Sequence, residues 1–202
     1  MRPARNAAVA SAVLAVALLG CDRGEPVSCP ARFSADPARQ ARIASMLDAG
    51  GEGRAALARW GRPLPMCFGP VPASVVTEKG VLLMDAQLDD ARAAARTAHL
   101  VTHLADGLPA LVKEQGDCDA RVEQALAAEA RALGLELRLL RELRAPPPEG
   151  GPWEVEIVYF AAEPAAREAA LRAYLRAHPD GAPGVDALAA GYAKRCAQGS
   201  PR

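Results

Sequence analysis

The sequence has no excess of charge of either sign and no cluster of basic residues. Among its 202 residues, 24 are Lys or Arg and 24 are Asp or Glu, so the formal net charge is zero. Because surfaces that bind phosphate backbones need clustered Lys and Arg, nucleic acid is not an expected partner. Aromatic residues make up only 4% of the chain, but 50% of the residues are hydrophobic, which is typical of a folded domain and not of a disordered chain.

Long apolar runs are also lacking, because a helix that spans a bilayer needs about 20 consecutive apolar residues. The apolar run at residues 7–19 is shorter than that and follows two basic residues, Arg2 and Arg5. A positive segment followed by a short apolar run is typical of a secretory signal. We therefore expect export and not a membrane-spanning helix.

The apolar run ends in LLGC at residues 18–21. This resembles the lipobox of bacterial lipoproteins, whose cysteine is acylated and becomes the new N-terminus after cleavage. The resemblance implies a signal peptide over residues 1–20 and a lipidated tether over residues 21–35, with palmitate-type chains on Cys21. Since each buried methylene contributes about 0.8 kcal/mol, a multiply acylated cysteine is a firm membrane anchor. The expected location is the bacterial cell envelope, at the inner or the outer membrane; a plain secretory signal with a chance cysteine is the alternative.

The remaining cysteines lack the CxxC spacing of a zinc-thiolate site. Four cysteines in an exported chain indicate two disulfides, for which three pairings exist. The pairing that we expect is Cys29–Cys67 with Cys118–Cys196.

Periodicity, capping residues and Gly or Pro breaks predict the secondary structure. Helices are predicted over residues 37–49, 53–60, 87–106, 118–144, 163–177 and 185–196. Strands are predicted over residues 74–77 and 81–84, which form a hairpin, and residues 61–72 are predicted as loop. Residues 153–160 are ambiguous between helix and strand, and their alternation of apolar and acidic residues favours a strand.

The expected fold class is therefore α+β, mostly helical, with a small β-hairpin or antiparallel sheet. We expect one globular domain over residues 36–198, of which residues 153–198 form a helical C-terminal portion.

A candidate metal site comes from two of the predicted helices. His99 and His103 are four residues apart, so both imidazoles project from one face of a helix and can share a metal. Glu129 lies close to the apolar stripe of the next helix, where a carboxylate is desolvated and needs a partner. The sequence thus offers two imidazoles and one carboxylate as ligands.

The order of apolar strand, HxxxH helix and Glu-bearing helix resembles the gluzincin class of zinc metallopeptidases. Residues 80–106 look like the edge strand and active-site helix of that family, and residues 129–134 look like its third-ligand segment. The resemblance covers residues 74–144. It implies a zincin-like helix pair in which His99, His103 and Glu129 are the ligands of a zinc ion.

Two positions depart from the family pattern. The family motif is HExxH, whose Glu is the general base, and Leu100 stands at that position. Leu133 stands where the family has an Asp that would support the ligands. We therefore interpret the chain as a pseudo-peptidase without catalytic residues, which binds or scaffolds an unknown envelope protein or peptide. Asp106, one turn beyond His103, is a poor candidate for a replacement base.

Two other hypotheses remain open at this point. The first is a zinc hydrolase with an unorthodox base. The second is a structural helical lipoprotein without a metal site, because a helical wheel places both histidines on a stripe with Arg92, Arg96 and Asp106. In that case the histidines would face water, and one of the arginines would pair with Glu129.

Overall fold

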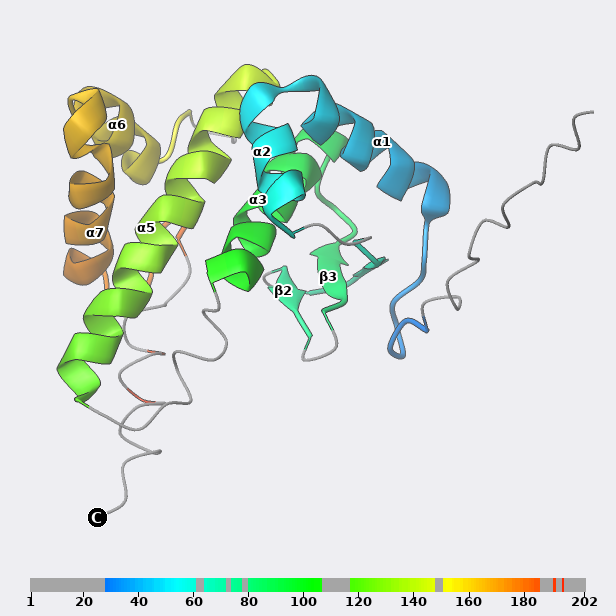
Figure 1. Cartoon of the computed structure of the whole chain (residues 1–202), viewed down its shortest axis with the longest axis horizontal. Helices are drawn as coiled ribbons and strands as arrows, with labels where there is room; N and C mark the ends of the chain where they lie inside the picture. The colour runs from blue at the N-terminus through cyan, green and yellow to red at the C-terminus, as the bar shows by residue number, and fades with distance from the viewer. Residues whose placement is uncertain are drawn as a thin grey trace, which may run out of the picture.

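The computed structural model describes residues 28–60, 64–71, 74–77, 80–106, 117–147, 151–185, 191 and 194. It is mostly helical with one small sheet, so the expected α+β class is confirmed (Figure 1). The helices are α1 (Pro37–Ala49), α2 (Gly51–Trp60), α3 (Asp90–Asp106), α5 (Cys118–Glu142), α6 (Glu154–Ala161) and α7 (Arg167–Ala177), the last preceded by a 3-10 turn, η1 (Pro164–Ala166). The strands are β1 (Met66–Gly69), β2 (Val75–Val76) and β3 (Leu82–Asp85).

Helices α3 and α5 lie side by side in the middle of the molecule, between two apolar clusters. The first cluster joins α1, α2, α3 and the sheet, and its fully buried members include Ile43, Leu82 and Val101. The second joins α5, α6 and α7 around Tyr159 and Leu171. The interface between α3 and α5 is therefore enclosed by packed elements on both sides (Figure 1).

The sheet is mixed and not purely antiparallel. Its strand order is β1-β3-β2, in which β2 and β3 pair antiparallel as the predicted hairpin. Strand β1 pairs with β3 in parallel, with Met66 opposite Leu82. The prediction of loop over residues 61–72 is therefore wrong at Met66–Gly69, all four residues of which are buried. Nothing local in this Gly- and Pro-rich stretch favours a strand, which forms because β3 supplies its hydrogen-bonding partners.

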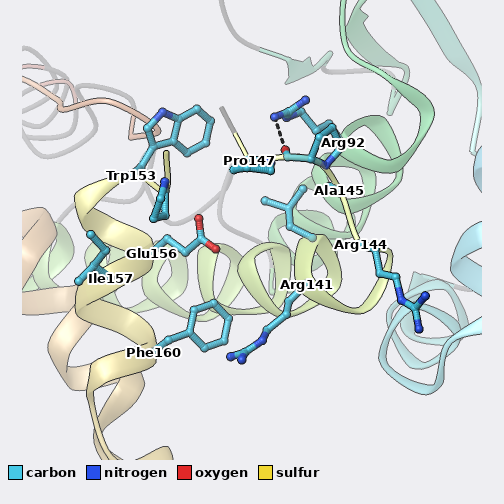
Figure 2. Close-up of a pocket in the computed structure, with 12 residues that line it drawn as sticks. Arg92, Arg141, Arg144, Ala145, Pro147, Trp153, Glu156, Ile157 and Phe160 are labelled. Carbon is cyan, nitrogen blue, oxygen red and sulfur yellow. Dashed lines mark hydrogen bonds between the residues drawn. The ribbon is translucent and has the colours of Figure 1, made fainter. Parts of the chain in front are cut away.

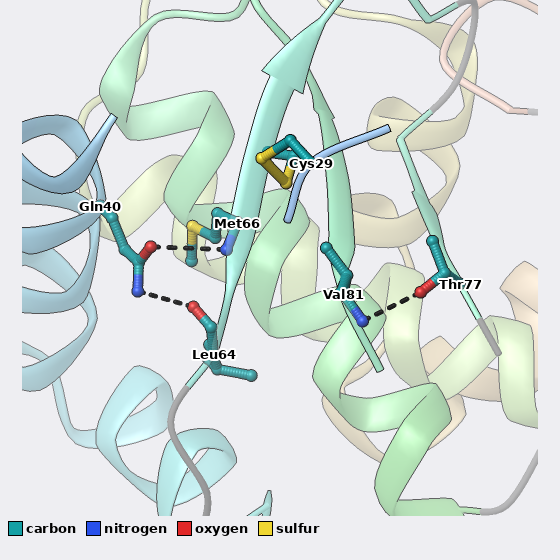
Figure 3. The surroundings of a disulfide bond; sticks show 7 residues. Cys29, Gln40, Leu64, Met66, Thr77 and Val81 are labelled. Atoms are coloured by element: carbon teal, nitrogen blue, oxygen red, sulfur yellow. Dashed lines mark hydrogen bonds between the residues drawn. A yellow bond between two sulfur atoms is a disulfide. The ribbon is translucent and has the colours of Figure 1, made fainter. Parts of the chain in front are cut away.

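Several contacts hold the outer edge of β1 (Figure 3). The side-chain amide of Gln40, on α1, donates to the carbonyl of Leu64 at 2.7 Å and accepts from the amide of Met66 at 3.4 Å. Ser34 forms an antiparallel bridge with Phe68, with N–O distances of 2.9 and 2.8 Å. These bonds satisfy backbone groups that an edge strand would otherwise leave unpaired.

The disulfide Cys29–Cys67 is present, as expected (Figure 3). It ties residue 29 to β1, so part of the segment expected to be a tether is fastened to the sheet. Cys118 is also disulfide-bonded. Its expected partner, Cys196, lies outside the described residues, so that pairing stays a prediction.

The prediction of a strand over residues 153–160 is wrong, because Glu154–Ala161 form helix α6. The alternation of apolar and acidic residues suggested a strand, but the two buried side chains of the helix, Val155 and Tyr159, are four residues apart and lie on one helical face. The hydroxyl of Tyr159 accepts a 2.5 Å hydrogen bond from Arg138 on α5. Packing against α5 and α7 thus overrides the β propensity of the segment.

Most of the remaining predictions agree with the structure. The predicted helices over residues 37–49, 53–60, 87–106, 118–144 and 163–177 correspond to α1, α2, α3, α5 and α7 with small shifts at their ends. The predicted helix over residues 185–196 and the signal segment, including Cys21, fall largely or wholly outside the described residues. Among the residues that the structure does describe, no helix combines the length and apolarity needed to cross a membrane.

Candidate metal centre

Local sequence places the candidate ligands on facing helices. Asp89 caps α3 by accepting a hydrogen bond from the amide of Arg92 at 2.8 Å, and the Ala-rich run that follows favours a helix. Asp117 caps α5 in the same way, accepting from the amide of Asp119 at 3.0 Å. Helix α3 carries His99 and His103 one turn apart, and α5, which packs along it, carries Glu129.

The three side chains predicted to share a site do meet. The Nε2 atoms of His99 and His103 are 2.8 Å apart. Oε2 of Glu129 is 3.0 Å from Nε2 of His103 and 3.4 Å from Nε2 of His99. Three potential ligand atoms from two helices therefore form one compact triangle.

The site is buried, which contradicts the exposure of the histidines that the alternative without a metal site predicted. His99 is 6% exposed, His103 8% and Glu129 3%. The expectation of a plain amphipathic helix whose histidines face water is therefore wrong. The polar stripe of α3 is covered by α5, and a histidine-rich stripe can be buried there because α5 presents carboxylates to it.

The triangle has the size that a metal ion requires. A tetrahedral zinc ion with ligands at 2.0–2.2 Å has ligand–ligand distances of about 3.3–3.6 Å. The observed edges of 2.8, 3.0 and 3.4 Å come close to that, so small side-chain rotations would suffice. The group of His99, His103 and Glu129 could therefore hold a metal ion.

A second carboxylate lies behind His99. Nδ1 of His99 is 2.8 Å from Oε2 of Glu136, on α5, in a close ion-pair contact whose angle falls short of a well-aligned hydrogen bond. Oε1 of Glu136 is 3.2 Å from Nε of Arg96. Such a carboxylate orients a metal-binding imidazole and fixes which of its nitrogens faces the ion.

The arginines of the stripe have carboxylate partners of their own. Arg96 pairs with Glu136, and Arg92 pairs with Asp89 at 2.6 Å. Arg96 therefore offsets the charge of the carboxylate behind His99, while the face of the cluster that would meet a cation is formed by the two imidazoles and Glu129.

Burial and charge shift the ionisation of this cluster. Burial alone would lower the pKa of His99, but contacts with Glu129 and Glu136 outweigh it and raise that pKa to about 9. Burial alone would raise the pKa of the Glu129 carboxyl, but the two imidazoles hold it well below its usual range. In the metal-free protein at neutral pH, the positive charges of His99 and Arg96 thus balance the negative charges of Glu129 and Glu136. A metal cation would have to displace the proton of His99.

Leu100 and Leu133, the two positions that depart from the expected motif, belong to the apolar clusters. Leu100 packs in the first cluster with the sheet and α1, and Leu133 packs in the second with α6 and α7. Asp106, judged a poor candidate for a replacement base, is held by Arg59 at 2.6 Å and by Arg131 at 3.0 Å. Its carboxylate therefore links α3 to Arg59 on α2 and to Arg131 on α5.

Sequence reasoning did not assign Glu136 a role in this site. The only signal was its position seven residues after Glu129, which places both on nearly the same face of α5. That spacing indicates a shared face, but it does not tell which histidine nitrogen each carboxylate meets.

The chain matches no protein-family model, no curated protein and no solved structure.

Proposed function

We propose that this protein is an envelope lipoprotein, anchored through Cys21, whose buried site binds a zinc ion without hydrolysing peptides. The ion would join α3 to α5 and fix their relative position. The domain would then act as a binding or scaffolding module for an envelope protein or peptide.

The observation that carries the metal proposal is the triangle of Nε2, Nε2 and Oε2 atoms with edges of 2.8, 3.0 and 3.4 Å. Two imidazole nitrogens facing each other at that distance need a proton or a cation between their lone pairs. Two His and one Glu form a donor set typical of zinc, with borderline nitrogen ligands and one carboxylate. Burial adds support, since a desolvated cluster gains more from a dication than an exposed one.

The absence of peptidase activity is inferred from the residue beside the first histidine. A general base contributes typically 10²–10⁴-fold to the rate, and Leu100 cannot accept a proton. The other acid considered, Asp106, is engaged by Arg59 and Arg131. Bound zinc would thus lack a positioned proton acceptor.

Export is supported by two independent features. The LLGC motif ends a short apolar run at the start of the chain. The Cys29–Cys67 disulfide fits an oxidising compartment, where disulfides persist.

Metal analysis of the purified protein tests the central claim. The protein must carry no polyhistidine tag, because its own three histidines are the variable under study. We expect about one zinc per chain, loss of zinc in His103→Gln, and retention in the matched control His178→Gln, which changes the histidine at the end of α7. Zinc-free wild-type protein after exposure to zinc would refute the metal proposal, and zinc-dependent cleavage of peptides would refute the non-catalytic one.

The anchor needs a separate experiment. Cells that express the chain are labelled with palmitate and fractionated. We expect label and membrane association in the wild type and neither in Cys21→Ser. Unlabelled, soluble wild-type protein would favour the alternative of a plain secretory signal.

A further inference from the structure

A second site lies away from the metal centre, between the C-terminal end of α5, the segment that follows it, and α6 (Figure 2). It is a pocket of about 460 Å³, within the range of cavities that hold small organic ligands. The residues that line it include Arg92, Leu140, Arg141, Trp153, Glu156 and Phe160.

One wall of the pocket is apolar and aromatic. Trp153, Ile157 and Phe160 line it from α6 and its N-cap, at the spacing that places residues on one helical face. Trp153 is held in place by Gly184, where even a Cβ atom would lie 2.3 Å from the indole ring. The side chain of Ile157 is 55% exposed, although large apolar side chains are usually covered. A fixed indole beside an uncovered isoleucine is a surface suited to a ligand ring.

Cationic side chains also line the pocket. The guanidinium of Arg141 lies over the ring of Phe160, with its carbon 4.7 Å from the ring centroid. Arg92 is fixed by a 2.6 Å hydrogen bond that it donates to the carbonyl of Pro146, and Arg144 also lines the pocket (Figure 2). Within the described part of the chain, no carboxylate lies within ion-pair distance of Arg141 or Arg144. Asp89 offsets the charge of Arg92, so the guanidinium groups of Arg141 and Arg144 stand against one carboxylate among the described lining residues, that of Glu156.

We propose that this pocket binds a small organic anion with an aromatic body. The aromatic wall would stack against the ring of the ligand, and the guanidinium of Arg141 would pair with its carboxylate or sulfonate. A planar guanidinium both stacks on rings and donates to anions, which a lysine in that position would do less well. Because the arginines that line the pocket carry more positive charge than Glu156 carries negative charge, the pocket favours an anionic ligand. The proposal does not depend on the metal centre.

Two fluorescent probes that differ in one group test it. 1-Anilinonaphthalene-8-sulfonate carries an anionic group on an aromatic body, and N-phenyl-1-naphthylamine is the same body without the sulfonate. Each is titrated into the purified mature chain, residues 21–202, whose fold is checked by circular dichroism. We expect saturable binding of the sulfonate at one site per chain and weaker binding of the neutral probe. Added salt should weaken only the sulfonate, because it screens the guanidinium.

Three substitutions of matched size probe the charges. Arg141→Gln should weaken the sulfonate probe about fivefold and leave the neutral probe unchanged. Glu156→Gln should tighten binding of the sulfonate probe, because it removes the one carboxylate found among the described residues that line the pocket. Arg172→Gln is the control, because the charge of Arg172 acts on Glu123. Glu123 lies 18 residues, or about 27 Å, along α5 from Arg141. Unfolding would weaken binding of the sulfonate probe in both variants. Opposite effects of Arg141→Gln and Glu156→Gln on its affinity would therefore not result from unfolding.

Ile157→Ser tests the apolar wall. Because the side chain is half exposed, the substitution should spare the fold while weakening both probes equally. Three results would each overturn the proposal: no saturable binding, equal affinity for the two probes, or an Arg141→Gln effect no larger than that of Arg172→Gln.

Discussion

If the proposed site binds zinc, removing one imidazole from it should abolish most of the thermal stability gained in the presence of zinc. A ligand that binds only the folded state stabilises it by RT ln(1 + [L]/Kd), which is about 4.1 kcal/mol when free zinc is 1,000 times Kd. For a domain of this size, 1 kcal/mol shifts Tm by about 2–4 °C. The wild-type protein should therefore unfold about 8–16 °C higher in zinc than in a chelator.

The structure makes this magnitude reasonable because the ligands are already assembled. The three ligand atoms lie 2.8–3.4 Å apart, so little reorganisation offsets the binding free energy. His103→Gln keeps a polar side chain of similar length but leaves only one imidazole and one carboxylate. We expect its Tm to be nearly the same with and without zinc.

Thermal unfolding followed by far-UV circular dichroism, without reductant so that the disulfides persist, measures both quantities. His178→Gln is the control, because its ring lies beside the backbone carbonyl of Tyr174 on α7 and should leave the zinc shift intact. A wild-type Tm that is the same in zinc and in chelator would refute the reasoning. So would a zinc shift that survives His103→Gln.

Four further predictions concern the surroundings of the site and the sheet. Glu136→Gln should weaken zinc binding about 10–100-fold, as measured by competition with a chelating dye, because it removes the carboxylate behind His99. Leu100→Glu should lower the free energy of unfolding in urea by about 3 kcal/mol and give no peptidase activity, because it places a carboxylate in the first apolar cluster. Replacing both cysteines of Cys29–Cys67 by serine should cost about 4 kcal/mol in urea unfolding, since the disulfide closes a loop with a sequence separation of 38. Asp106→Asn should cost about 1 kcal/mol at pH 7. Because the two arginines lower the folded-state pKa of Asp106, this difference should begin to fall below about pH 4, near the unfolded-state pKa, and disappear only as the pH drops through the lower folded-state pKa.

The first two of these have a control variant, and each of the four has a contrary result. Glu142→Gln, an exposed glutamate on the same helix, should leave zinc affinity unchanged; equal effects at both positions would contradict a role for Glu136. Leu100→Met should be nearly neutral, because it conserves volume, and peptidase activity in Leu100→Glu would show that the site can be catalytic. Unchanged stability of the double serine variant would contradict the loop-closure argument. An Asp106→Asn difference that persists unchanged in acid would contradict the ion-pair account.

The failures of sequence reasoning have a common cause. Met66–Gly69 became a strand because β3 lies beside it, and Glu154–Ala161 became a helix because α5 and α7 cover one of its faces. Both segments are short, and a short segment takes the structure that its neighbours permit. No local pattern reports those neighbours.

The sequence by itself determined the features that depend on helical period and on local chain chemistry. The spacing of His99 and His103 placed both on one face, and Glu129 fell close to the apolar stripe of the next long helix. Capping aspartates and Gly or Pro breaks located most of the helices to within a few residues.

Only the tertiary structure decided that the histidine-bearing face of α3 is buried along with its apolar face. A stripe of arginines and histidines is equally suited to water or to a face of carboxylates, and the choice depends on how α5 packs against it. That packing brought Glu129 and Glu136 to opposite nitrogens of one imidazole. Contacts between α5 and the later segments likewise brought Arg141 and Trp153 to the lining of one pocket. Contacts between residues far apart in the chain are set by the free energy of the whole core, which no local window of sequence contains.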